Sequence, residues 1–548
     1  MKNNGTDIYR IYIDRSLFIY GYINSITDKY SYFSITTYES QLDELLEHLE
    51  SLEMQICFDS LQTEYQLLDD IISTRQLYLE LTPSQQLEMM CRKMMSIVKK
   101  DVPIITEKDY YIPQVDLSKL LGLNTSIRTT RISDVAEQFN ISFPKEYNEI
   151  PESLGKQFFS SKFNNTQVND YIEKSTLVIR ELLKYSYKKL DIVSARKAIS
   201  SCFGLKTTLN MSNIKAGEVF ACRLYCKKEG IALKDFPKPS VKLCDKTLSD
   251  IVKDNSCHFH NNDFNEYSKY LSGLKMKYDT TISYSFIFDN IILKFGNGGM
   301  HGCVEPGVYK SDKSGVLMSF DISSFYASII VMNKYYPSHL KESFVSVVED
   351  MLKQRISLID NGLDSDKPKI DVLKEMLVGI YGKFKEQQSN LYDSTLQLKI
   401  TVASQLFMLK WIDCMMCFNG IEFLSINTDG FIVRVPEEHV DKIDRLTNGI
   451  SLRLNMHIKS YKIDKIYIKD VNNYMCILKS GEIVKVGCFD DSVNIYRTPR
   501  SRKIASAIND YFIYNVDNEK MKRKYDSSVI KDAFKIIYSI TEQQQSLF

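Results

Sequence analysis

The sequence predicts a multidomain protein of mixed α/β and α+β class. Its 548 residues exceed the size at which a single hydrophobic core normally stops growing. In the N-terminal third, residues 8–23 have the pattern of two strands joined by a turn. A charged helical pattern (42–54), a short strand (55–60) and further helical stretches to about residue 200 follow, which is typical of an α/β domain. In the second half, two β-rich segments each carry an aspartate at a strand end.

Composition is ordinary for a soluble globular protein, with 44% hydrophobic and 25% charged residues. The formal net charge of +1 argues against a protein that coats nucleic acid by bulk charge, but it allows a local basic channel. The cysteines form no paired framework, and no signal peptide or long apolar span is visible, so we expect a cytoplasmic protein without a membrane partner. The close pairs Cys222/Cys226 and Cys414/Cys417 are interpreted as core residues rather than as a zinc site.

The first chemically informative segment is VLMSFDISSFYASII, residues 316–330. It places Asp321 at the end of an apolar strand and follows it with a polar, aromatic turn and a new apolar run. A carboxylate in this position can hold a divalent metal ion, while the N–H groups of the turn can meet a phosphate group.

A second segment, FLSINTDGFIVRV (423–435), repeats this arrangement about a hundred residues later. Two β-rich runs flank Asn427-Thr428-Asp429-Gly430, which predicts a hairpin with Asp429 at its tip. Two carboxylates on two strand ends that come together would form a two-metal site for phosphoryl transfer.

Between these segments, LKEMLVGIYGKF (373–384) predicts a helix with Lys374, Val378 and Tyr381 on one face. Lys374 is a point charge that suits a triphosphate. Tyr381 offers a flat ring to a base pair, and Gly382 leaves room for a close backbone approach.

In order and spacing, these segments resemble motifs A, B and C of family B DNA polymerases, in particular the short polymerases of phages and linear plasmids. The residues that match motif A (D-x-x-S-L-Y-P-S) are Asp321, Ser324, Phe325, Tyr326, Ala327 and Ser328. Those that match motif B (K-x-x-x-N-x-x-Y-G) are Lys374, Tyr381 and Gly382, with Val378 where Asn is usual. Those that match motif C (D-T-D) are Asn427, Thr428 and Asp429. The segments KFGNGGMHG (294–302) and YIKDVNNYMCI (467–477) resemble the family's Gly-rich and K-x-Y segments.

The resemblance implies a ribonuclease H-like, exonuclease-type domain followed by a right-hand polymerase palm with short helical fingers and a small thumb. The predicted boundaries are 1–205 for the exonuclease-like domain, 206–345 for a linker and the first part of the palm, 346–390 for a fingers hairpin, 391–491 for the rest of the palm and 492–548 for the thumb. Basic runs at 497–503 and 520–524 are candidates for DNA contact.

The resemblance also implies the role of each residue. Asp321 and Asp429, with the Ile322 carbonyl, would bind two Mg²⁺ ions, for which Mn²⁺ can substitute. The nucleotide-binding residues would be Ser324, Phe325, Tyr326, Arg355, Lys374 and Tyr381, with Tyr326 blocking a ribose 2′-hydroxyl. The DNA-binding residues would be Gly298, Gly299, Gly382, Lys469 and Tyr474. The expected partners are primer–template DNA, deoxynucleoside triphosphates and replication accessory proteins of a phage or mobile element.

The exonuclease motifs depart from the family pattern. The expected acids align with Asp14 and Ser16, with Asp59 and Glu64, with Asp116 and with Ser175, so two carboxylates are lost and a third is a Glu in place of Asp. Because each Mg²⁺ ion needs oxygen ligands and neutralising charge, we predict a scaffold with little or no nuclease activity. The alternative is a shifted alignment in which a nearby acid, Asp7 or Glu173, serves instead.

Three other functions stay open at this level. The decayed exonuclease motifs favour a catalytically inactive nucleic-acid-binding relic, whereas the retained Asp321, Asp429, Lys374 and Tyr326 disfavour it. A reverse transcriptase would carry two adjacent acids at the hairpin tip, where this chain has Asp429 and then Gly430. A primase would require de novo initiation, on which the sequence is silent.

Overall fold

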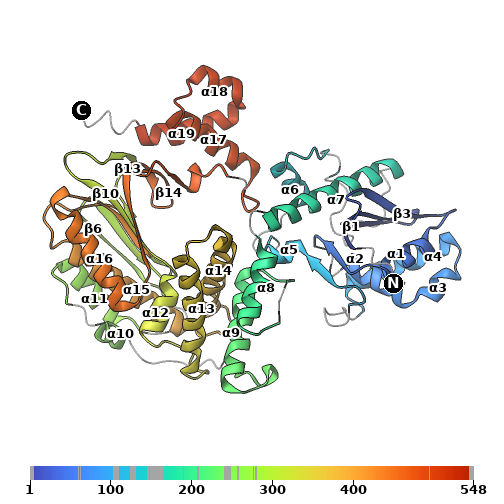
Figure 1. Ribbon diagram of the computed structural model, residues 1–548, viewed down its shortest axis with the longest axis horizontal. Coiled ribbons are helices and arrows are strands. Elements are labelled where there is room, and N and C mark those ends of the chain that lie inside the picture. The colour runs from blue at the N-terminus through green and yellow to red at the C-terminus, as the bar shows by residue number, and fades with distance from the viewer. Residues whose placement is uncertain are drawn as a thin grey trace. The chain divides into compact units, whose positions relative to one another are not determined.

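The computed structural model describes residues 5–59, 61, 63–102, 110–123, 131–144, 147, 164–188, 191–206, 209–239, 248–255, 258–275, 277, 280–492 and 494–541. The chain divides into two compact units (Figure 1). The first comprises residues 1–213 and 494–499, and the second comprises residues 214–493 and 500–548. The mixed, multidomain architecture that the sequence predicts is therefore present, while the five finer boundaries stay predictions.

The first unit is built on a five-stranded sheet in the order β3-β2-β1-β4-β5. Its strands are β1 (Thr6–Ile13), β2 (Leu17–Asn24), β3 (Tyr30–Thr36), β4 (Met54–Cys57) and β5 (Gln114–Asp116). β1 and β2 form the predicted antiparallel hairpin, and β4 pairs in parallel with β1 and β5. The alternation of side chains along β1 and β2 supplies apolar residues to both faces, so the sheet needs helices on both sides.

Both faces of this sheet are covered by helices. Tyr9 and Ile11 of β1 pack with α1 (Leu42–Glu50), α2 (Glu64–Ser73) and α4 (Pro83–Lys99). On the other face, Leu17 and Ile19 of β2 pack with Tyr171 and Ile172 of α7 (Asn165–Lys188). Figure 1 shows α7 and the group α1, α2 and α4 on opposite sides of the strands. The remaining helices are α3 (Arg75–Leu79), α5 (Leu117–Leu120), α6 (Ile132–Gln138) and α8 (Ile192–Cys202).

The second unit contains a ten-stranded sheet in the order β15-β14-β13-β10-β12-β11-β8-β7-β6, with β9 paired to β13. Its strands are β6 (Ser283–Phe288), β7 (Ile291–Gly296), β8 (Gly299–Cys303), β9 (Gly307–Lys310), β10 (Val316–Ile322), β11 (Glu422–Asn427), β12 (Gly430–Val435), β13 (Ile458–Asp470), β14 (Asn473–Leu478) and β15 (Ile483–Val486). The two predicted carboxylate segments thus become neighbouring strands, β10 and β12, in the middle of one sheet.

Helix α15 (Ser394–Met415) packs against the central strands of this sheet, and further helices complete the unit. The indole of Trp411 on α15 lies 4.7 Å from the ring of Phe431 and 5.9 Å from that of Phe320. The predicted pair of helices between the two aspartates is confirmed as α13 (Ser343–Asp360) and α14 (Lys367–Lys383). The other helices here are α9 (Asn213–Glu229), α10 (Ser249–Asp254), α11 (Asn262–Gly273), α12 (Phe325–Met332) and α16 (Val440–Leu454), and the short 3-10 helices are η2 (Leu233–Asp235), η3 (Asp364–Asp366), η4 (Glu437–His439) and η5 (Gly487–Phe489).

The C-terminal segment forms a small helical group, as the sequence predicts. It contains α17 (Pro499–Phe512), α18 (Asn518–Lys524) and α19 (Ser527–Thr541), which lie together in Figure 1. Their apolar side chains, including Ile508 and Ile537, form a core with Tyr467 of β13 and Met475 of β14. This core fixes the helical group to one end of the sheet.

Two expectations from composition have different outcomes. Cys222 and Cys226 are buried, as predicted, but Cys414 and Cys417 are exposed, so their assignment to the core is wrong. They lie at and just beyond the C-terminal end of α15, where the helix face turns to solvent. None of the helices that the structure describes combines the length and the apolar character needed to cross a bilayer.

Candidate active site

The sheet brings Asp321 and Asp429 together. Asp321 of β10 lies opposite Gly430, the residue that follows Asp429. The backbone N–H of Ile322 donates to the carbonyl oxygen of Asp429 over 2.8 Å. Asn427 pairs with Gly430, which leaves Thr428 and Asp429 in a two-residue turn and confirms the predicted hairpin. Both aspartates therefore sit at the same end of adjacent antiparallel strands.

Gly430 explains why the hairpin carries a single acid at its tip. A Cβ atom at this position would lie 2.2 Å from the carbonyl oxygen of Phe320 on β10. Any side chain would thus push β12 away from β10 and separate the two aspartates. An aspartate in place of Gly430, as in the reverse-transcriptase pattern, would meet the same carbonyl oxygen.

The pKa values of both carboxyl groups are raised, and the cause differs between them. Partial removal from water, with repulsion from Asp321 added, raises the pKa of Asp429 to about 6. Partial desolvation also raises the pKa of Asp321, although Lys374 and Lys459 oppose the shift. Because like charges at short range destabilise the ionised pair, a cation placed between these groups would be bound favourably.

The oxygen donors present suit magnesium. In the part of the chain that the structure describes, no group of three or more His, Cys, Asp or Glu side chains could hold a metal ion. The donors are therefore the carboxylates of Asp321 and Asp429, with the Ile322 carbonyl as a further candidate. Mg²⁺ typically takes one or two carboxylates and completes its shell with water and substrate phosphates, so this limited set fits an ion that arrives with a triphosphate.

Two lysines face the carboxylates from different elements. Lys374 of α14 is exposed, and its charge lowers the pKa of both aspartates. Lys459 of β13 is paired directly with Asp321 and has the same effect on it. Lys374 was predicted from the sequence, whereas Lys459 was missed, because only strand pairing places it beside Asp321.

Arg355 has a more structural position than the sequence suggests. Its side chain is only 4% exposed, and its guanidinium donates to Ser324 Oγ (2.7 Å) and to the Ile370 carbonyl (3.3 Å). Ser324 has a left-handed backbone (φ 55°) at the start of α12. Arg355 therefore stabilises the turn that follows Asp321, and its contact with phosphate stays a prediction.

Tyr326 and Tyr381 form a rigid aromatic pair. Their rings stack at 3.8 Å with an interplanar angle of 12°. The Tyr326 hydroxyl donates to the Gly298 carbonyl over 2.8 Å, and the Tyr381 hydroxyl is hydrogen-bonded to Thr401 Oγ1 (2.7 Å). Burial raises the pKa of both hydroxyls. Val378, where the motif has Asn, is 49% exposed on the same helix.

The glycines of the β7–β8 turn differ in their surroundings. Gly299 has φ +134°, and a Cβ atom there would lie 2.1 Å from Oγ1 of Thr428. Gly299 thus lets this turn pack against the residue next to Asp429, a role that the sequence did not indicate. Open space surrounds Gly298 and Gly382, so the predicted close approach of DNA is sterically possible at both.

The last two predicted DNA-binding residues lie on β13 and β14. Lys469 forms an ion pair of 3.4 Å with its neighbour Asp470. Burial raises the pKa of Tyr474 to about 12, with smaller contributions from Cys476, Asp321 and Asp429. Tyr474 therefore lies within the field of the two aspartates, and DNA contact by either residue stays a prediction.

In the first unit, the aligned exonuclease residues serve local structure. Asp14 accepts hydrogen bonds from the backbone N–H groups of Ser16 (2.7 Å) and Leu17 (2.9 Å) and so caps the β1–β2 turn. Glu64 is buried and lies 3.6 Å from the guanidinium of the equally buried Arg10. An internal cation thus stands beside the acid that the alignment assigns to a metal.

The other members of that set are only partly engaged. One oxygen of Asp116 accepts from the backbone N–H of Asp59 and from Ser118, whereas its Oδ2 has no hydrogen-bond partner among the described residues. Ser175 is fully buried on α7. Asp7, one of the alternative acids, is buried and hydrogen-bonded to Tyr20, Asn24 and His48.

Comparison with known proteins finds likeness among solved structures. No protein-family model matches the sequence, and no curated protein does. Among solved structures, the fold is similar to that of the family B DNA polymerase from the hyperthermophilic archaeon Pyrobaculum calidifontis, with a TM-score of 0.46 and 13% sequence identity. The match covers 99% of this chain and 65% of that polymerase, so the chain spans about two thirds of its length.

The raised pKa of Asp429 predicts that this residue opposes folding. The folded-state pKa of about 6 exceeds the value near 3.9 of an unfolded Asp, so stability is lost as pH rises between these values. In EDTA at pH 7.5, Asp429→Asn should stabilise the second unit by on the order of 1 kcal/mol, because the side chain is partly solvated. The gain should vanish near pH 4. Thermal unfolding measures this gain, and the exposed Asp464→Asn serves as the control. A loss of stability in Asp429→Asn at pH 7.5 would contradict the prediction.

The two glycines of the β7–β8 turn form a matched pair for substitution. Gly299→Ala should destabilise the fold by about 2 kcal/mol or more, because its Cβ atom meets Thr428 and its φ is positive. Gly298→Ala should change stability by less than about 0.5 kcal/mol, since space is open there. Chemical denaturation of both variants tests the difference, and Thr428→Ala should partly rescue Gly299→Ala. Equal effects of the two alanines would refute this packing.

Proposed function

We propose that the chain is a DNA-directed DNA polymerase that extends a primer 3′-hydroxyl with deoxynucleoside triphosphates. The observation that supports this most directly is the Asp321/Asp429 pair on adjacent strand ends, with Lys374 and Lys459 beside it. When a triphosphate binds together with a divalent cation, the cation neutralises the two carboxylates. The phosphate groups neutralise the two lysines.

In this proposal, each residue of the site has a defined role. Asp321, Asp429 and the Ile322 carbonyl would hold two Mg²⁺ ions. Magnesium, when bound, lowers the pKa of the primer 3′-hydroxyl and offsets charge on the leaving group. Lys374 binds the triphosphate from the α14 side while the primer oxygen bonds to the α-phosphorus. The bond to the β-phosphate oxygen breaks, pyrophosphate leaves with that electron pair, and the hydroxyl proton passes to solvent.

The aromatic pair shapes the nucleotide site. The Tyr326 ring is fixed by its stack on Tyr381 and by its bond to Gly298, so it presents a rigid edge to the sugar. A 2′-hydroxyl would meet this edge, whereas a 2′-hydrogen fits. DNA approaches the open surfaces at Gly298 and Gly382, and Lys469 and Tyr474 contact its backbone.

The proposed polymerase lacks proofreading. The Glu64–Arg10 pair and the turn cap made by Asp14 support this, because each engages a carboxylate that a metal ion would need. Release of a labelled mismatched 3′ nucleotide in Mg²⁺, if it survives Asp321→Asn and is lost on Asp14→Ala, would contradict this part of the proposal.

Primer extension tests the proposal directly. Asp321→Asn and Asp429→Asn should each lower incorporation by several orders of magnitude, because each removes charge from the cation site. Asp464→Asn, an exposed aspartate on β13, should keep full activity. If the unmodified chain binds primer–template DNA but never extends it, the chain is a binding relic. Extension by both active-site variants would contradict the assignment.

Sugar selection tests the role of the aromatic pair. Tyr326→Val should raise incorporation of ribonucleotides by about tenfold or more relative to deoxynucleotides, because it removes the ring that abuts the sugar. Tyr326→Phe keeps the ring and loses the hydroxyl with its bond to Gly298, so discrimination should be retained. Competition between the two nucleotide types in single-turnover extension measures both. Unchanged selectivity in Tyr326→Val would place the discrimination elsewhere.

A further inference from the structure

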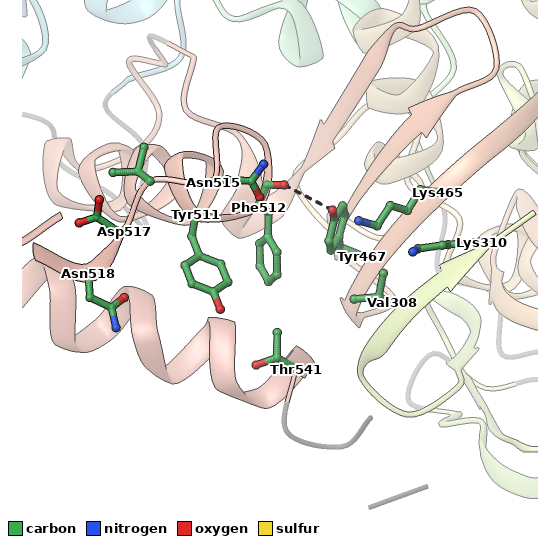
Figure 2. A pocket seen from close by; sticks show the side chains of 11 residues that line it. Val308, Lys310, Lys465, Tyr467, Tyr511, Phe512, Asn515, Asp517, Asn518 and Thr541 are labelled. Atoms are coloured by element: carbon green, nitrogen blue, oxygen red, sulfur yellow. Dashed lines mark hydrogen bonds between the residues drawn. The ribbon is translucent and has the colours of Figure 1, made fainter. Parts of the chain in front are cut away.

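A cavity of about 460 Å³ lies in the second unit between β9, β13 and the C-terminal helices. Figure 2 shows Lys310 and Lys465 on the strands, with Tyr511 and Phe512 on the opposite side. The volume falls in the range of small-ligand sites. None of the residues assigned above to the polymerase site lines it.

The two lysines that line this cavity are close enough to repel each other when no anion is bound. Lys310 and Lys465 are directly opposite each other in the antiparallel β9–β13 pair. Like charges in this position destabilise a sheet. Within the described residues, neither lysine forms an ion pair, and Lys465 Nζ instead lies 4.4 Å from the centre of the Tyr467 ring. Two neighbouring ammonium groups of this kind are suited to a compact dianion.

The other walls supply aromatic and amide groups. The rings of Tyr467 and Phe512 are 4.6 Å apart, and Tyr511 packs edge-on against Phe512 at 5.2 Å. Asn518 adds an amide side chain. The acidic lining residue, Asp517, is already engaged, since it accepts from the Lys520 N–H (2.9 Å) and pairs with Lys520 Nζ (3.3 Å). Positive charge therefore dominates next to a stacking surface.

We propose that this cavity binds a nucleoside phosphomonoester, with the phosphate between Lys310 and Lys465 and the base against the aromatic wall. A phosphomonoester carries close to two negative charges at neutral pH, which matches two lysines, whereas each phosphodiester within a strand carries one. The ligand is a free nucleotide or the 5′-phosphorylated end of a strand. This site does not depend on the proposed polymerase activity.

Equilibrium binding in EDTA tests the site, because chelation removes divalent cations from the Asp321/Asp429 pair. The probes are dAMP, deoxyadenosine, inorganic phosphate, and a ten-nucleotide strand with and without a 5′-phosphate. The unmodified chain should bind dAMP at least about tenfold more tightly than deoxyadenosine or inorganic phosphate alone. Preference for dAMP identifies a free nucleotide as the ligand, and preference for the phosphorylated strand identifies a strand end.

The lysines provide the decisive variants. The double change Lys310→Gln/Lys465→Gln should weaken dAMP binding at least about tenfold, and Lys313→Gln, exposed in the nearby β9–β10 turn, should leave it unchanged. Lys310→Gln alone should raise the unfolding midpoint by about 1 °C without ligand, which also verifies folding. Undiminished dAMP binding by the double variant would overturn the proposal. Equal binding of dAMP and deoxyadenosine by the unmodified chain would also overturn it.

Discussion

Two like charges are held side by side by a backbone hydrogen bond in the middle of a sheet. The Ile322 N–H donates to the Asp429 carbonyl oxygen over 2.8 Å and so joins the end of β10 to the start of β12. The carboxylates of Asp321 and Asp429 therefore lie at the same end of the two strands. Burial, together with repulsion from Asp321, raises the pKa of Asp429. Lys374 and Lys459 of the same unit partly compensate this charge.

Close packing maintains the arrangement. Gly430 lets β12 approach β10, and Gly299 lets the β7–β8 turn rest on Thr428, so glycines on two strands position one turn. Arg355 stabilises the turn on the other side through Ser324. These groups hold the two carboxylates in place, and in the proposed polymerase this pre-organisation would favour electrostatic catalysis.

Much of this architecture follows from local sequence patterns. The strand before Asp321, the hairpin around Asp429 and the pair α13–α14 all have short-range signals in hydrophobic periodicity and turn residues. Lys459 and the Gly299–Thr428 contact have none, because they depend on the pairing of strands far apart in the chain. The same limit explains Cys414 and Cys417, whose exposure is set by where α15 leaves the sheet.

The central claim is that Asp321 and Asp429 together bind divalent cations, and that protons compete with these cations for the carboxylates. The most direct measurement is a titration with Mn²⁺, followed by electron paramagnetic resonance, in the presence of a deoxynucleoside triphosphate at pH 7.5 and pH 5.5. We expect protein-dependent uptake of Mn²⁺ at pH 7.5 that weakens several-fold at pH 5.5, where Asp429 is largely protonated, and that Asp429→Asn abolishes. Mn²⁺ uptake that is the same at both pH values and is unchanged in Asp429→Asn would contradict the claim.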